Sequence, residues 1–221
     1  MISNFEFAQN HTYWEQRDLT DEKRDLEEKG ENWIQDYILS VNHPHRDVIL
    51  KGLQTFGEIE SVLEIGCNTG PNLKRIHEAY PNLRLAGIDV NSMTIKEAKK
   101  QVPTASFYVA DVTRDLRLFE DKSFDIILTD AVLIYVGMNE IRNVINEIDR
   151  IARSGVMLLE WGHHNTEPGL VIDYHWARNY SNIFLKKGFH CLTYKINEKE
   201  WPSSKTWKRN GYLYCAYRQA S

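Results

Sequence analysis

Cysteine, excess basic charge and long apolar runs are all scarce in this sequence, and each scarcity excludes a class of protein. The 221 residues include three cysteines, Cys67, Cys191 and Cys215, and no C-x-x-C pair. This odd, sparse set argues against a disulfide framework and against a structural zinc site. The formal net charge is −4, so binding to nucleic acid would need a local basic patch. We therefore predict no nucleic-acid partner.

No segment for export or membrane insertion is apparent in the sequence. The first residues lack the basic and apolar regions of a signal peptide. The most apolar stretch, residues 126–138, is interrupted by Thr129 and Asp130 and is too short to span a bilayer. Hydrophobic residues make up 42% of the chain and charged residues 26%, as in an ordinary globular domain. We expect a soluble cytoplasmic protein without membrane contact.

From residue 61 onward, short apolar runs alternate with segments of helical periodicity. The predicted strands are 61–65, 83–89, 106–110, 124–129 and 156–160, and the predicted helices between them are 72–80, 92–101 and 138–152. Such alternation indicates βαβ units and a parallel sheet. Two further strands, predicted at 190–196 and 211–218, complete an α/β fold with a mainly parallel seven-stranded sheet and helices on both faces.

The regions before and after this alternation have a different pattern. Residues 1–60 are charged and aromatic, with apolar stripes at helical spacing in residues 32–41 and again after Pro44. We interpret them as an N-terminal helical lid on a core of residues 61–221. The elements predicted after the fifth strand are a loop over 161–172, a helix over 174–187 and a second long loop over 198–210. Loops of that length in a compact domain are usually functional.

The first predicted strand leads into a glycine-containing loop, residues 66–70 (Gly-Cys-Asn-Thr-Gly). Ligands of open α/β sheets bind at the carboxyl ends of such strands, and Gly66 and Gly70 allow close approach of the backbone. The dinucleotide-binding pattern G-x-G-x-x-G is absent, because Asn68 and Pro71 stand at its second and third glycine positions. The loop therefore suits a smaller adenosine-containing cofactor better than a pyrophosphate.

Acidic residues lie at or near the carboxyl ends of four predicted strands: Glu64, Asp89, Asp111 and Asp130. Asp89 comes 19 residues after Gly70 (89 − 70), where a carboxylate can accept hydrogen bonds from both ribose hydroxyls. Taken alone, Asp89 or Asp111 fits a helix cap or a solvated loop equally well. Their common position at strand ends favours a ligand-binding role for the set.

In these motifs residues 61–160 resemble the class I S-adenosylmethionine-dependent methyltransferases, a family with a Rossmann-like fold. The resemblance implies that S-adenosylmethionine is the cofactor. The cofactor-binding residues that it implies are Glu64, Gly66, Cys67, Asn68, Gly70 and Asn72 around the first loop, Asp89, Val90 and Asn91 after the second strand, Asp111 and Val112 after the third, and Asp130 and Ala131 after the fourth.

The resemblance also sets expectations for the acceptor of the methyl group. The N-terminal lid and the segments 161–180 and 198–210 can enclose a pocket, which favours a small molecule methylated at oxygen or nitrogen. The glycine loop and the segment Val-Leu-Ile-Tyr look loosely like methylases of nonulosonic-acid sugar biosynthesis, so a sugar or nucleotide-sugar is the first guess. Arg17 and Arg46 are predicted to pair with a carboxylate of cofactor or substrate. The prediction for the oligomeric state includes a homodimer.

Candidate bases for the acceptor's proton are sought at the same sheet edge. His163 and His164 leave the fifth predicted strand and, with Asp130, are the candidate catalytic residues; both histidines fit surface loop positions equally well. Asp130 better suits the cofactor's ammonium group. Asp173 and His175 could join the two histidines in a metal site by ligand type, but the spacing matches no known motif and no metal is predicted.

In the second predicted loop, an aromatic and basic group stands out: Trp201, Trp207, Lys208 and Arg209. These residues could contact a flat or anionic acceptor, or a protein partner. Three other functions stay open for the whole chain. They are an NAD-dependent oxidoreductase, which the missing glycine pattern disfavours, a non-catalytic S-adenosylmethionine-binding module, and an aminopropyl transferase that uses decarboxylated cofactor.

Overall fold

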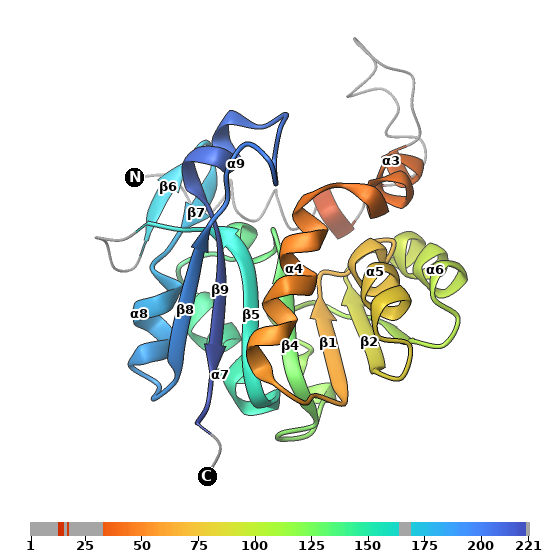
Figure 1. Ribbon diagram of the computed structural model, residues 1–221, viewed down its shortest axis with the longest axis horizontal. Coiled ribbons are helices and arrows are strands. Elements are labelled where there is room, and N and C mark those ends of the chain that lie inside the picture. The colour runs from red at the N-terminus through yellow and green to blue at the C-terminus, as the bar shows by residue number, and fades with distance from the viewer. Residues whose placement is uncertain (1–12, 16, 18–32, 164–168, 220–221) are drawn as a thin grey trace.

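A twisted seven-stranded sheet forms the centre of the computed structural model, which describes residues 13–15, 17, 33–163 and 169–219 (Figure 1). Its strands are β1 (Ser61–Ile65), β2 (Arg84–Asp89), β3 (Ser106–Val109), β4 (Phe124–Asp130), β5 (Ala152–Trp161), β8 (His190–Lys195) and β9 (Gly211–Tyr217). The order across the sheet is β3-β2-β1-β4-β5-β9-β8. The first five strands pair in parallel, and β9 is antiparallel to both of its neighbours. The predicted mainly parallel sheet is confirmed.

Helices cover both faces of this sheet, as predicted. Between residue 33 and the end of the described chain, the α-helices are α3 (Trp33–Leu39), α4 (His45–Leu53), α5 (Pro71–Ala79), α6 (Ser92–Gln101), α7 (Ile141–Ile151), α8 (Tyr180–Leu185) and α9 (Lys205–Asn210). Short 3₁₀ turns occur at η1 (Ser40–Asn42), η2 (Gln54–Phe56), η3 (Leu116–Leu118) and η4 (Leu133–Tyr135). Successive side chains of a strand point to opposite faces. Accordingly, Val62 packs in the core below α4, α5 and α6, and Leu63 packs in the core below α7 and α8.

The connections leave a crevice at one edge of the sheet. From β1 the chain proceeds outward through β2 to β3, then returns to place β4 on the other side of β1. Ligands of open α/β sheets bind where the strand order reverses in this way, outside the carboxyl ends of the strands. Ile65 and Asp130 end the two strands that flank this point.

Helix α4 packs in the core of the domain, although the sequence places it within the predicted lid over residues 1–60. Val48, Ile49 and Leu53 are buried against the sheet. A β-carbon on Gly52 would lie 2.7 Å from Met157 Sδ of β5, so the helix packs tightly on the side chains of that strand. Of the remaining predicted lid, residues 1–12, 16 and 18–32 lie outside the described residues.

The predicted helix over 174–187 is wrong for its first half. Two short antiparallel strands, β6 (Leu170–Ile172) and β7 (His175–Ala177), form a hairpin there. Asp173 and Tyr174 have φ angles of 45° and 64°, as the two central residues of a tight hairpin turn require. Only α8 is helical, and the Asn179 side chain caps it by accepting the Asn182 backbone N–H at 3.0 Å.

The predicted loops and boundaries near residues 140–160 and 198–210 need smaller corrections. Strand β5 is longer than predicted because it pairs with β9 from Gly155 to Trp161. Helix α7 is correspondingly shorter than the predicted 138–152. Helix α9 occupies part of the predicted 198–210 loop, and the Ser204 hydroxyl caps it by accepting the Trp207 N–H at 3.2 Å. Within the described residues, every helix is too short or too polar for a bilayer-spanning segment.

Candidate active site

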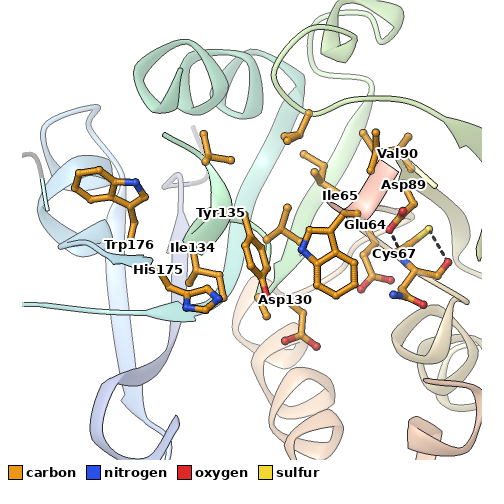
Figure 2. A pocket seen from close by; sticks show the side chains of 18 of the residues that line it. Glu64, Ile65, Cys67, Asp89, Val90, Asp130, Ile134, Tyr135, His175 and Trp176 are labelled. Carbon is orange, nitrogen blue, oxygen red and sulfur yellow. Dashed lines mark hydrogen bonds between the residues drawn. The ribbon is translucent and has the colours of Figure 1, made fainter. Parts of the chain in front are cut away.

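A cavity of about 1130 Å³ opens at the carboxyl edge of the sheet. Its walls include strand ends, η4, the start of α4, the β6–β7 hairpin and two tryptophans near α9. Figure 2 shows Asp89, Cys67 and Glu64 toward one side and His175 and Trp176 toward the other, with Tyr135 and Asp130 between them. Small-molecule pockets commonly measure roughly 300–1,000 Å³, so this cavity has room for a cofactor and an acceptor together.

The glycine loop after β1 is fixed by its backbone conformation and by the neighbouring strand. Gly66 and Asn68 both have positive φ, 71° and 49°. A side chain on Gly66 would collide with Val132, so the position requires glycine. The Cys67 N–H donates to the Ile88 carbonyl at 2.9 Å, and the Asn68 N–H donates to Asp89 Oδ2 at 2.9 Å. The loop is therefore held open toward the cavity before any ligand arrives.

Glu64 and Asp130 form a buried acid pair at the centre of the cavity. The Asn72 amide donates to Glu64 Oε1 at 2.6 Å and to Asp130 Oδ2 at 3.0 Å. The other oxygen of each acid, Glu64 Oε2 and Asp130 Oδ1, is buried and has no hydrogen-bond partner among the described residues. Burial raises the pKa of Glu64 to about 8, and the nearby charge of Asp130 adds to that shift. A ligand cation beside these two oxygens would satisfy them and would favour the ionised form of Glu64.

Burial would also raise the pKa of Asp130, but its neighbours outweigh that effect and hold the pKa below its ordinary value. His45 Nε2 lies 3.0 Å from Asp130 Oδ2, and Arg46 Nη1 lies 3.6 Å from the same oxygen. The Arg46 guanidinium also donates to the Ser40 carbonyl and hydroxyl, each at 2.7 Å, and to Asn72. Arg46 therefore lines the cavity while balancing the charge of the acid pair.

Two further acids mark the opposite half of the cavity. Asp89 lines it and accepts backbone N–H groups through both of its carboxylate oxygens. Asp111 lines it as well, accepting the Thr113 N–H and hydroxyl at 2.8 Å each and pairing with Arg114 at 2.7 Å. Val90 and Val112, the residues after these acids, are also in the wall, as are Cys67, Asn68 and Ala131.

Three predicted cofactor residues support the wall without forming it. Gly70, Asn91 and Arg17 are not among the residues that line the cavity. Gly70 precedes α5, at a φ of 80°. The Asn91 side chain caps α6 and donates to the backbone carbonyls of Trp14 at 3.0 Å and Arg17 at 2.7 Å. The Arg17 guanidinium lies over three aromatic rings, the nearest being Trp33 at 4.4 Å.

Aromatic side chains form most of the wall beyond Asp130. They are Trp14, Tyr37, His43, His45, Tyr135, Trp161, His175, Trp176, Trp201 and Trp207. Trp201 is stacked between His45, at 4.3 Å, and Trp207, at 4.1 Å with 2° between the ring planes. Lys208, which the sequence suggested as a contact for an acceptor or a protein partner, pairs with Glu198 at 2.6 Å.

Comparison with known proteins connects this cavity to a family. Residues 62–155 match the family described as "Methyltransferase domain". Residues 62–155 form a class I methyltransferase domain. Their range contains the glycine loop and all four strand-end acids, and the chain has the Rossmann-like fold of the S-adenosylmethionine-dependent enzymes.

Curated relatives of the methyltransferase domain differ in the acceptors for which they are named. The malonyl-[acyl-carrier protein] O-methyltransferase of Bacillus cereus is 25% identical over 125 residues, which are 55% of this chain and 45% of that protein. The trans-aconitate 2-methyltransferase of Shigella dysenteriae is 25% identical over 166 residues, or 73% and 64% of the two chains. The chain thus spans less than two thirds of the length of either relative.

A solved structure extends the likeness of fold beyond this domain. The magnesium protoporphyrin IX methyltransferase of Synechocystis PCC 6803, solved with S-adenosylmethionine, superposes with a TM-score of 0.66 and 16% identity. The match covers 99% of this chain and 100% of the other. The antiparallel β8–β9 pair, which lies outside residues 62–155, is therefore within the shared fold.

Of the two histidines predicted to be catalytic, the structure describes His163, which does not line the cavity. His163 is absent from the lining residues, and its backbone N–H donates to the Arg178 carbonyl at 3.2 Å. The reason is that β5 continues to Trp161 and the chain then bridges to Arg178 at Gly162. We therefore no longer assign His163 a catalytic role. His164 lies outside the described residues.

Sequence reasoning missed His43 and His45, which line the cavity from the N-terminal side. A signal for them was present: two histidines flank Pro44, a residue that favours a helix start, in the region predicted to close the pocket. His175, the remaining histidine in the wall, comes from the unpredicted hairpin. Among the described residues, no cluster of three or more histidine, cysteine or acidic side chains could hold a metal ion.

Proposed function

We propose that this protein transfers the methyl group of S-adenosylmethionine to oxygen or nitrogen of a small molecule. The observation that carries the proposal is the buried acid pair, whose oxygens Glu64 Oε2 and Asp130 Oδ1 lack a donor in a cavity with room for two molecules. An α-ammonium group of a methionine moiety is a donor of the required charge. The family match over residues 62–155 supports the same cofactor.

The remaining cofactor contacts follow from the positions of the other acids. Asp89 would hold the ribose hydroxyls, and Val90 would lie beside the adenine. Asp111 and Val112 would hold the adenine edge, as their place in the wall allows. The bound cofactor supplies an electrophilic methyl group, which the acceptor attacks in line. The chain's own contribution is to bind and orient both molecules and to exclude water through its aromatic wall.

For the acceptor we propose a small molecule, and a sugar or nucleotide-sugar remains our first candidate from the sequence. The wall formed by the β6–β7 hairpin and by Trp201 and Trp207, in and before α9, supports a small molecule. These segments lie in or beside the two predicted acceptor-binding regions, 161–180 and 198–210. A cytoplasmic location and a homodimer also remain predictions, and sedimentation equilibrium would measure the second.

Thermal unfolding in the presence of S-adenosylmethionine, S-adenosylhomocysteine or NAD tests the cofactor. A ligand at 100 times its Kd adds about 2.7 kcal/mol to the free energy of unfolding. For a chain of 221 residues this corresponds to a Tm increase of roughly 5–11 °C. We expect the increase with the two sulfur compounds only, and a smaller one for Asp89→Ala than for the exposed-residue control Glu58→Gln. An increase with NAD alone would contradict the proposal and favour an oxidoreductase.

A second measurement separates an enzyme from a binding module. Release of S-adenosylhomocysteine is followed while a panel of small alcohols, phenols, amines and carboxylates is offered with S-adenosylmethionine. Acceptor-dependent release supports methyl transfer. Tight binding without release across the panel would support a non-catalytic module, and turnover of decarboxylated S-adenosylmethionine with a polyamine would support an aminopropyl transferase.

A further inference from the structure

Three side chains form a continuous chain of contacts from the acid pair to the acceptor half of the cavity. His45 Nε2 lies 3.0 Å from Asp130 Oδ2. The other ring nitrogen of His45, Nδ1, makes a short hydrogen bond with Nδ1 of His43. His45 and Asp130 are almost fully buried, while His43 is partly exposed and lines the cavity. The remaining nitrogen of His43, Nε2, has no hydrogen-bond partner in this chain of contacts.

The tripeptide His43-Pro44-His45 explains how two rings come together at this place. A residue before proline is restricted to extended conformations, and His43 has φ −66° and ψ 134°. Pro44 then caps α4, of which His45 is the first residue. The sharp change from extended to helical backbone brings both rings to the same side, 4.6 Å apart between centroids. Trp201 stacks on His45 and fixes its plane.

The proton positions in this chain of contacts follow from donor and acceptor rules. An ionised carboxylate only accepts hydrogen bonds, so His45 must carry a proton on Nε2. In neutral His45 the Nδ1 atom is then an acceptor. The proton of the short hydrogen bond therefore belongs to His43 Nδ1. Neutral His43 consequently has a bare Nε2, the form that accepts a proton.

We propose that His43 is the catalytic base and receives the acceptor's proton at Nε2, a role that rests on the methyl transfer proposed above. His45 and Asp130 are positioning residues, because their contacts set the tautomer of His43. As the acceptor attacks, its O–H or N–H bond breaks and the proton moves to His43 Nε2. The Nδ1 proton of His43 moves to His45 Nδ1. The bond electrons of the acceptor remain on the methylated atom, and the methyl–sulfur bond electrons remain on sulfur.

Charge placement favours this two-step relay over a charged His43. Burial lowers the pKa of His43 to about 4, and the neighbouring His45 and Arg46 add to the shift against the partial attraction of Asp130. A positive charge on His43 itself is thus disfavoured. After the relay the charge is on His45, 3.0 Å from the Asp130 carboxylate. His43 Nδ1, then bare, faces the backbone N–H of His45 at 3.5 Å.

Nitrogen-15 NMR of histidine side chains tests this assignment on the protein alone, without cofactor or acceptor. In the neutral state we expect the proton of His43 on Nδ1 and that of His45 on Nε2. As the pH is lowered, the first added proton should not make His43 doubly protonated. A neutral His43 protonated on Nε2, or a first proton that charges His43, would overturn the proposal.

Kinetics supply the second test. We expect His43→Gln to lower kcat by about 10²- to 10⁴-fold for an alcohol, phenol or amine of the panel. A carboxylate of the panel, already deprotonated, should lose little. Added imidazole should restore His43→Gly. His163→Gln, outside the cavity, is the matched control. Equal losses for carboxylates and alcohols would indicate a merely structural role and overturn the assignment.

The two tests fail in different ways. If unmodified protein binds no S-adenosylmethionine, the proposed function fails, and the tautomers of His43 and His45 can still be measured. If the cofactor binds and the tautomers are reversed, the relay alone fails. We expect unchanged cofactor affinity in His43→Gln, because the proposal gives His43 no contact with the cofactor itself.

Discussion

At the scale of single residues, the protonation of Glu64 is the most consequential feature of the cavity. Its pKa of about 8 means that the folded protein holds a proton there at neutral pH, whereas the unfolded chain does not. A carboxylic acid that keeps its proton only when folded stabilises the folded state less as the pH rises. The stability due to Glu64 is therefore full below the unfolded pKa and is lost as the pH approaches about 8.

This residue gives a pH-dependent prediction for the protein without ligand. We expect Glu64→Gln to have a higher Tm than the unmodified protein, by a margin that grows between roughly pH 5 and pH 8 because the amide has no proton to lose. Differential scanning calorimetry at several pH values measures the margin. Glu58→Gln, an exposed acid near the same strand, should show no growing margin. A margin independent of pH would contradict the raised pKa.

At the scale of elements, the η4 turn is held from both sides by buried charged residues. Glu160 accepts the backbone N–H groups of Val132, Leu133 and Ile134 at 3.0–3.3 Å. Arg178 donates to the carbonyls of Leu133 at 2.8 Å and Val136 at 2.6 Å. Because η4 carries Tyr135 into the cavity, these two side chains determine the shape of the wall.

Loss of this clamp should be costly. Arg178→Met removes two buried hydrogen bonds from a charged donor, each worth about 1.5–3 kcal/mol, and leaves two carbonyls unpaired. We expect the free energy of unfolding to fall by about 3 kcal/mol or more, measured by urea denaturation. Arg209→Met, at an exposed position of α9, is the control. Equal midpoints for the two variants would show that the clamp is not stabilising.

The elements also show where sequence patterns succeed and fail. The buried parallel strands and α5 and α6 were predictable, because apolar runs of strand length alternate there with helical periodicity. The β6–β7 hairpin was not, because its turn uses Asp173 and Tyr174 at positive φ and no glycine signals it. The spacing of the apolar residues after the turn therefore predicted one long helix.

At the scale of the whole molecule, the strand-end half of the cavity was predictable and the aromatic half was not. A local pattern locates the four acids, because each lies at or near the carboxyl end of a strand: Glu64, Asp89, Asp111 and Asp130. His43 and Trp201 meet in the same wall from positions 158 residues apart (201 − 43). No local pattern reveals such a contact, since it depends on how α4 and the segment before α9 pack across the sheet.

The walls of the cavity come from two parts of the chain, the middle and the two flanks. The parallel strands within residues 62–155 supply the glycine loop and the strand-end acids, while most of the aromatic wall comes from residues before 62 or after 155. Substitutions in the flanks can therefore reshape the aromatic wall while the glycine loop and the strand-end acids stay intact. Such a scaffold allows the acceptor to vary while the cofactor stays the same, and the relatives are indeed named for acceptors as different as trans-aconitate and malonyl-[acyl-carrier protein].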